Sequence, residues 1–154
     1  MYGYPDGTFK PNQNMSRAEF MAVIARMLGL EAVYGESAFT DVPADAWYSK
    51  YVNAVYKEGI AKGYADGTLK PEQEITREEA FAILYRIVKD QLNTSDHSSK
   101  QFADNEQLSD WAKEAVTALI DAHMLNGYPD GTIKPKNSIT RAEIAIILSR
   151  LLEL

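Results

Sequence analysis

Apolar residues recur with helical spacing in five stretches of the chain. Between residues 45 and 58, Trp47, Tyr51 and Val55 follow one another at i, i+4 and i+8, and residues 109–122 repeat this stripe. Both stretches predict amphipathic helices. The segments 20–30, 80–88 and 144–154 are apolar on nearly every side, which predicts three buried helices. We therefore expect an all-α fold in which these three form a central three-helix bundle, with the other helices and turn loops outside it.

The three buried helices share one start signal. Each begins with Ser or Thr followed three residues later by Glu, the capping box, at Ser16 and Glu19, Thr76 and Glu79, and Thr140 and Glu143. The box does not explain the Arg at the first helical position, because the helix dipole disfavours a cation there by about 0.3–1 kcal/mol. Two interpretations stay open for Arg17, Arg77 and Arg141. Each pairs with a nearby Glu or acidic loop, or each joins free helical N–H groups in holding an external anion.

A nine-residue motif occurs three times. Gly-Tyr-Pro-Asp-Gly-Thr-Phe-Lys-Pro at 3–11 returns with small changes at 63–71 and 127–135, whereas a Phe-x-Asp block followed by Trp occurs twice, from Phe39 and from Phe102. The chain thus contains three second halves and two first halves of one unit. We interpret residues 1–154 as a single domain: a partial repeat at 1–30, a linker at 31–38, a repeat at 39–92, a linker at 93–101 and a repeat at 102–154.

Tyr-Pro-Asp-Gly predicts a type I turn, so Asp6, Asp66 and Asp130 are interpreted as turn residues, since a calcium loop needs more oxygen ligands. The glycines that open the motif let backbone N–H groups approach a ligand closely. The lysines near its end either stay solvated or assist in binding an anion. Trp47 and Trp111 are either core anchors or the edge of a groove that stacks on a sugar ring. The glycines are Gly3, Gly63 and Gly127, and the lysines are Lys10, Lys70 and Lys134.

Composition narrows the function. A net charge of -6 and a pI near 4.9 argue against a nucleic-acid partner. The chain has no Cys and no metal-binding motif, and no apolar run long enough for membrane insertion. No basic and apolar leader follows Met1, so a signal peptide, if there is one, is expected outside this sequence. Neither His97 nor His123 lies beside a repeated nucleophile. We expect neither an enzyme nor a cofactor.

Together, the Phe-x-Asp and Trp block, the Gly-Tyr-x-Asp-Gly-Thr-x-Lys-Pro loop and the Thr-Arg-Ala-Glu helix start resemble the S-layer homology repeat across nearly the whole chain. The resemblance implies a pseudo-threefold, three-pronged spindle. It also implies an extracellular module of the bacterial cell wall that binds an anionic secondary cell-wall polysaccharide, through a terminal pyruvate ketal on a hexosamine, in grooves between repeats. The Arg of the helix-start motif is the residue that the resemblance assigns to ligand contact.

Two departures from the family pattern matter. Glu78 replaces Ala and is expected to place a carboxylate beside Arg77, which would weaken an acidic ligand there. The missing first half-repeat predicts grooves that pair Arg17 with Trp47 and Arg77 with Trp111, whereas Arg141 lacks a Trp. We expect a monomer, or alternatively a dimer or helix exchange through the uncovered flank. The competing functions are a protein–protein module of a surface layer and a small glycan-active enzyme.

Overall fold

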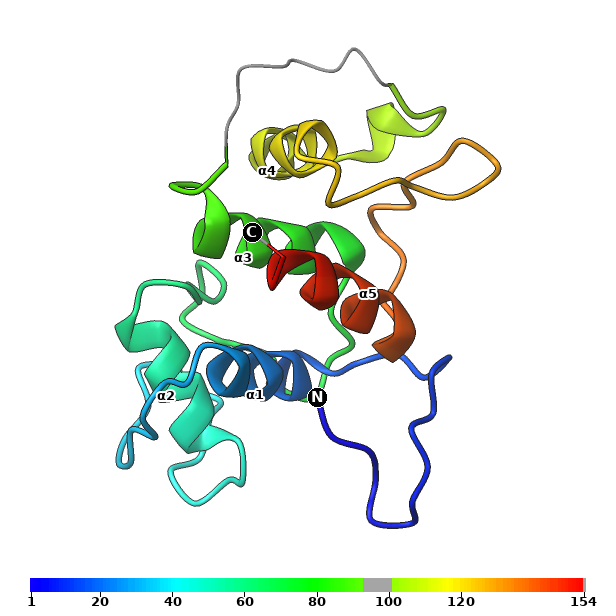
Figure 1. Ribbon diagram of the computed structural model, residues 1–154. Helices are drawn as coiled ribbons and strands as arrows, with labels where there is room; N and C mark the ends of the chain where they lie inside the picture. The colour runs from blue at the N-terminus through cyan, green and yellow to red at the C-terminus, as the bar shows by residue number, and fades with distance from the viewer. Residues whose placement is uncertain (93–100, 154) are drawn as a thin grey trace. The chain divides into compact units, whose positions relative to one another are not determined.

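The computed structural model describes residues 1–92 and 101–153, so most of the predicted linker 93–101 and His97 lie outside the described residues. Within those ranges the chain is helical, with five α-helices, one short 3-10 helix and no strand (Figure 1). The predicted all-α class is confirmed. The chain divides into two compact units, Met1–Ile75 and Thr76–Leu154. The three-pronged, threefold arrangement stays a prediction.

Unit 1 contains α1 (Arg17–Met27) and α2 (Ser49–Lys57), which pack against each other. The core between them includes Phe20, Ile24, Val52 and Val55, each shielded from solvent. The sequence predicted α2 over 45–58, but residues 45–48 form turns and a bend instead, and no side chain caps the helix at Tyr48. Gly59, with φ 70°, follows its C-terminal end and takes the left-handed conformation that suits glycine.

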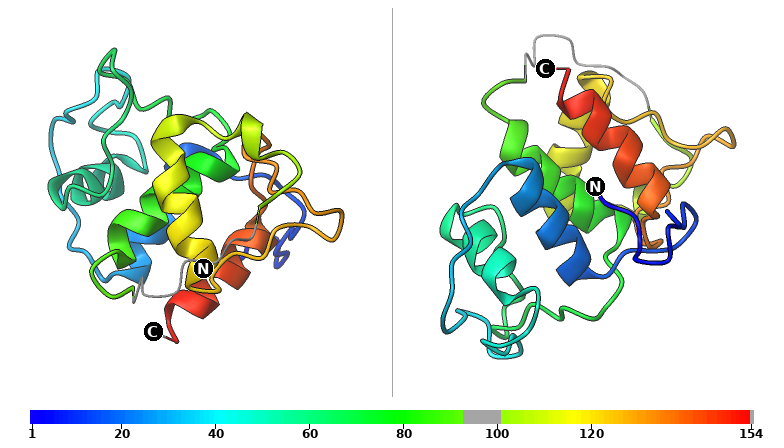
Figure 2. Two further views of the ribbon diagram at one scale, coloured as in Figure 1. Left: turned by 90° about the horizontal axis from the view of Figure 1, so that it is seen from above. Right: turned by 60° about the horizontal axis from the view of Figure 1, so that its bottom comes forward.

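Unit 2 contains α3 (Arg77–Val88), the 3-10 helix η1 (Asn105–Gln107), α4 (Asp110–Asp121) and α5 (Arg141–Leu151). Helix α4 packs against α3, and the loop between α4 and α5 extends away from both (Figure 2). His123 takes the place of the glycine after α4 and adopts φ 58°, the left-handed conformation that a side chain disfavours. The helix end keeps the hydrogen bonds of the glycine cap after α2, at a conformational cost.

The three helices that begin with a capping box, α1, α3 and α5, are buried to different extents. Helices α1 and α3 are buried along most of their length, as the sequence predicted. Helix α5 is less covered, and Ile146 on it is 53% exposed. Within its own unit, α5 has no helix packed against it as closely as α4 packs against α3.

Candidate functional site

The repeated loop is a tight turn closed by its own Asp. In each copy the carboxylate accepts hydrogen bonds from the backbone N–H and the hydroxyl of the Thr two residues on, at 2.6–3.0 Å. The Thr side chain and N–H lower the pKa of the Asp6, Asp66 and Asp130 carboxyls below the ordinary value. These residues therefore build the turn, as the sequence indicated.

The loop lysines adopt a conformation that side chains disfavour. Lys10, Lys70 and Lys134 have φ of 51°, 54° and 48°. In each loop the ammonium lies over the ring of the loop Tyr, 4.3–4.4 Å from its centroid. A left-handed residue that is not glycine costs about 1–2 kcal/mol. The same strained backbone therefore presents a cation and an aromatic ring together in every copy.

The Phe-x-Asp block holds this loop in both complete repeats. Asp41 accepts the N–H groups of Leu69 and Lys70, each at 2.8 Å, and Asp104 accepts those of Ile133 and Lys134 at 2.9 and 2.7 Å. The Phe of the block packs on the glycine that opens the loop, where a Cβ would overlap the Phe ring. The Asp bonds thus fix the strained lysines. The predicted role of Gly63 and Gly127 in ligand approach is untested, but both make room for a Phe; Gly3 lies close to the carbonyl of Thr8.

Arg17 and Arg77 are each covered by the loop of the following repeat. Arg17 donates its Nε–H to the carbonyl of Leu69 at 2.6 Å, and its guanidinium lies 4.6 Å from the Tyr64 ring centroid. Arg77 repeats this arrangement with Ile133 at 2.8 Å and Tyr128 at 4.6 Å. Arg17, Arg77 and Arg141 are each 5% exposed. In both described loops the guanidinium and the loop lysine lie over the same Tyr ring.

The N-termini of α1 and α3 are not open to an anion. Arg17 and Ala18 donate their backbone N–H groups to carbonyls of the following loop, at Gln73 and Pro71, at 2.8 and 2.9 Å. Arg77 and Glu78 donate in the same way to Asn137 and Pro135. The expectation of free N–H groups is therefore wrong at these two helices, because the next loop of the chain satisfies them. The capping boxes at all three helices are confirmed.

Glu143 has a second role besides capping. One of its oxygens accepts from the Arg77 guanidinium at 2.6 Å and from the Tyr128 hydroxyl. Burial and the bond to Glu143 raise the pKa of Tyr128 to about 12. Burial acts to raise the pKa of Glu143, but hydrogen bonds from Tyr128 and Thr140 and the charge of Arg77 outweigh it and lower that pKa. Arg77 thus has an acidic partner, the first of the two interpretations left open.

We expected the Glu78 carboxylate to lie beside Arg77, but it bonds to other residues. Its carboxylate is nearly fully buried and accepts from the backbone N–H and hydroxyl of Ser109, at 3.0 and 2.9 Å, and from Lys136 Nζ at 2.5 Å. Ser109 is the N-cap residue of α4 and makes no side-chain bond to its own helix. Glu78 therefore supports the start of α4 from the neighbouring helix. In unit 1 the corresponding residue is Ala18, and α2 begins three residues later relative to the repeated Trp.

Both tryptophans are exposed, so the groove-edge interpretation fits better than the core interpretation. Trp47 is 55% and Trp111 58% exposed. Trp111 lines a groove of about 250 Å³ between α3 and α4, together with Ala82, Tyr85, Arg86, Lys89, Glu114 and Ala115. Burial lowers the pKa of the Arg86 guanidinium, which remains a cation at neutral pH. Arg77 lies instead with Ile133, Tyr128 and Glu143, so the expected pairing with Trp111 stays a prediction.

Sequence reasoning missed the cation that lines the Trp111 groove. Arg26, Arg86 and Arg150 recur with the 60- and 64-residue spacings of the loop motif, a signal that was available in the sequence. In unit 1, Arg26 donates to the Tyr51 hydroxyl at 3.2 Å and lies 4.6 Å from its ring centroid. Arg150 donates to the carbonyl of Met124 at 2.9 Å.

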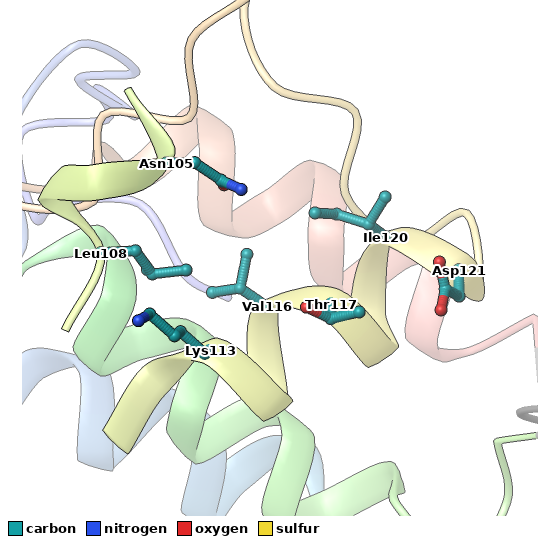
Figure 3. Close-up of a pocket in the computed structure, with 7 residues that line it drawn as sticks. All are labelled: Asn105, Leu108, Lys113, Val116, Thr117, Ile120 and Asp121. Carbon is teal, nitrogen blue, oxygen red and sulfur yellow. The ribbon is translucent and has the colours of Figure 1, made fainter. Parts of the chain in front are cut away.

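A second, smaller hollow lies between η1 and α4. It measures about 150 Å³, and the side chains of Leu108 and Val116 point into it, with Lys113 at one end and Asp121 at the other (Figure 3). It contains no aromatic residue. The Trp111 groove is thus the better candidate for stacking on a sugar.

None of the helices in the described parts of the chain has the length and apolar composition needed to cross a bilayer.

Comparison with known proteins identifies the family. The model of the S-layer homology domain matches residues 1–21, 38–81 and 101–145. The chain is 38% identical to Cell surface glycoprotein 1 of Acetivibrio thermocellus and 32% identical to the Cellulosome-anchoring protein of the same organism, in each case over 98% of the chain. It is 36% identical to the Amylopullulanase of Thermoanaerobacterium thermosulfurigenes, also over 98% of the chain. The chain spans only 7%, 35% and 8% of these three proteins, respectively. With three matched segments that follow its own repeats, the chain belongs to the S-layer homology domain family.

Proposed function

We propose that this chain is a non-catalytic anchoring module that binds an anionic secondary cell-wall polysaccharide through a terminal pyruvate ketal on a hexosamine. One observation carries the proposal: Trp111, 58% exposed, lines a groove that also contains Arg86 and Lys89. An exposed aromatic face stacks on the apolar face of a sugar, and the cations attract a carboxylate. The relatives include a Cellulosome-anchoring protein, which agrees with an anchoring role.

The loops supply the second part of the proposed site. Lys70 and Lys134 are held in strained conformations beside Tyr64 and Tyr128, and such strain is common at functional sites. Because little of their surface reaches solvent, Arg17, Arg77 and Arg141 contribute mainly their charge to the proposed site. Arg17 and Arg77 also hold the residues of the loops that cover them. The turn-builder Asp residues offset part of this charge, since Asp130 lies 3.4 Å from Lys134.

We propose no catalytic role for this chain. Glu19, Glu79 and Glu143 are committed to capping boxes, and Glu78 is bound to Ser109 and Lys136. A glycosidase needs two carboxyl groups that flank the scissile bond. The groove at Trp111 is lined by one carboxylate, Glu114, which accepts from Tyr85. Enzyme names among the relatives are consistent with this module being attached to catalytic parts of longer proteins.

Sedimentation with purified cell walls tests the function. We expect the chain to pellet with walls that retain their secondary polymer and to stay in solution once the polymer has been removed chemically. Trp111→Ala should weaken binding, whereas Ile146→Ala, which shortens a similarly exposed apolar side chain on α5, should not. Undiminished binding to stripped walls would contradict the polysaccharide proposal and favour a protein partner.

Location and assembly follow from the same proposal. A module that binds wall polymer works outside the cell, and we propose that it does so as a monomer. Light scattering at several protein concentrations tests the monomer, and a mass that rises towards twice 17.2 kDa would contradict it.

A further inference from the structure

The helix pairs α1/α2 and α3/α4 differ by a reciprocal exchange of side chains. Where α4 has Ala115, the corresponding position of α2 has Tyr51, counted from the repeated Trp. Where α3 has Tyr85, the corresponding position of α1 has Ala25. Each helix pair therefore holds one Tyr and one Ala at these two positions, on opposite helices.

In unit 1 this Tyr contacts two neighbouring cations. The Tyr51 hydroxyl accepts from Arg26 at 3.2 Å, and the ring lies 4.6 Å from the Arg26 guanidinium and 5.2 Å from the Lys50 ammonium. Interaction with both cations lowers the pKa of the Tyr51 hydroxyl, with the hydrogen bond from Arg26 as the largest cause. Tyr51 thus occupies the place in which an aromatic or anionic ligand would meet these cations.

In unit 2 the Tyr lies on the other helix of the pair, α3, and bonds to a carboxylate. Tyr85 donates its hydroxyl to Glu114 at 2.9 Å, and the small Ala115 borders the groove of about 250 Å³ beside Arg86 and Trp111. The groove therefore offers open space beside Trp111, into which we expect one sugar unit to enter. Charge alone would favour unit 1, where Lys50 takes the position of Glu114, so the selection must rest on the Tyr51 and Ala115 positions rather than on charge.

We propose that Tyr51 is an internal occupant that closes the groove of unit 1, and that the Trp111 groove of unit 2 is the one that receives the acidic sugar. This inference rests on the proposed function, since it selects between two copies of the same kind of site. Tyr51 and Ala115 are then the residues that determine which repeat binds.

The two tryptophans of the chain provide separate reporters. We would titrate the ¹⁵N-labelled full chain with a hexosamine that carries a pyruvate ketal, and with the same sugar without the ketal, and follow both indole N–H signals by NMR. Trp47→Phe assigns the two signals. In the unmodified chain we expect the Trp111 signal to shift at a concentration at least about tenfold lower than any shift of Trp47, the factor expected from losing one cation–aromatic contact and one hydrogen bond.

Two variants test the determinant itself. Tyr51→Ala should make the Trp47 signal respond at least about tenfold more tightly, because it uncovers Arg26 and Lys50. The double variant Tyr85→Ala and Ala115→Tyr reproduces the unit 1 arrangement and should abolish the Trp111 response; its helical circular dichroism would verify folding. Equal response of both signals in the unmodified chain, or no gain at Trp47 in Tyr51→Ala, would overturn the inference while leaving the function intact. Silence of both signals in every variant, together with no binding to walls, would instead overturn the proposed function.

Discussion

The hydrogen bonds by which the Asp of the Phe-x-Asp block holds the repeated loop, called the clasp below, allow a quantitative test at Asp104. Its Oδ1 accepts from the Ile133 N–H at 2.9 Å and its Oδ2 from the Lys134 N–H at 2.7 Å, and the residue is buried. Asp104→Asn keeps one oxygen but turns an amide N–H₂ towards a backbone donor. One hydrogen bond to a charged group is then lost and one N–H stays unpaired, which costs about 1.5–3 kcal/mol.

The counterpart in unit 1 sets the scale. Asp41 makes the same two bonds, each at 2.8 Å, but it is only partly buried. Water can replace a lost bond there, so Asp41→Asn should cost about 1 kcal/mol less than Asp104→Asn. Glu106→Gln removes the same charge from an exposed side chain near Asp104 and should change the free energy of unfolding by less than about 0.5 kcal/mol.

Urea unfolding followed by circular dichroism measures the free energies, and hydrogen exchange locates the loss. We expect Asp104→Asn to speed exchange at Ile133 and Lys134 before it affects α3. A free energy of unfolding equal to that of Glu106→Gln, with unchanged protection at Ile133, would refute the clasp as a stabilising element.

Three further predictions concern unit 2. Gly127→Ala should lower the free energy of unfolding by about 2–3 kcal/mol, because the added Cβ would overlap Phe102. Gly131→Ala should lower it by only about 1 kcal/mol, because Gly131 has φ 80° but open space around it. Equal losses in urea titrations would contradict the Phe contact. Glu78→Ala should increase hydrogen exchange in the first turn of α4 at a cost of about 1–2 kcal/mol. This is less than the cost of breaking a fully buried pair, because Lys136 can turn to water, and unchanged exchange there would count against the support from Glu78. The folded pKa of Tyr128 is raised from 10.0 to about 12, so its contribution to stability is present below pH 10 and is lost as the pH rises through 12. Tyr128→Phe should therefore reduce the fall of unfolding free energy with pH in this range, measured by urea titrations. An unchanged pH dependence would contradict this role of Tyr128.

Local chemistry made much of the fold predictable. The capping boxes fixed where α1, α3 and α5 begin, because Ser or Thr and Glu satisfy N–H groups within four residues. The amphipathic stripe predicted α2 and α4, but it missed that α2 starts later. At the start of α4, Ser109 bonds to Glu78, which lies 31 residues away in the chain, whereas the corresponding residue in unit 1 is Ala18.

The candidate site was harder to predict, because the partners of its charged groups are distant in sequence. The carbonyl that accepts from Arg17 is 52 residues away, and the carboxylate that binds Arg77 is 66 residues away. A capping motif shows that an N–H is satisfied from within its own turn. It does not show that a later loop supplies carbonyls to the N–H groups of Arg17 and Ala18. Exposure of Trp111 likewise depends on tertiary packing.

The carbonyls of Gln73 and Pro71 at the start of α1 have a consequence for biosynthesis. The N–H of Arg17 stays bonded to water until Gln73, which is synthesised 56 residues later, supplies its native acceptor. At the usual elongation speed of about 5–20 residues per second this delay lasts roughly 3–11 s. During that interval the apolar side chains of α1 lack their native partners. Ribosomal pausing or chaperone binding during synthesis of residues 17–73 should therefore influence the yield of folded protein more strongly than the same event after residue 75.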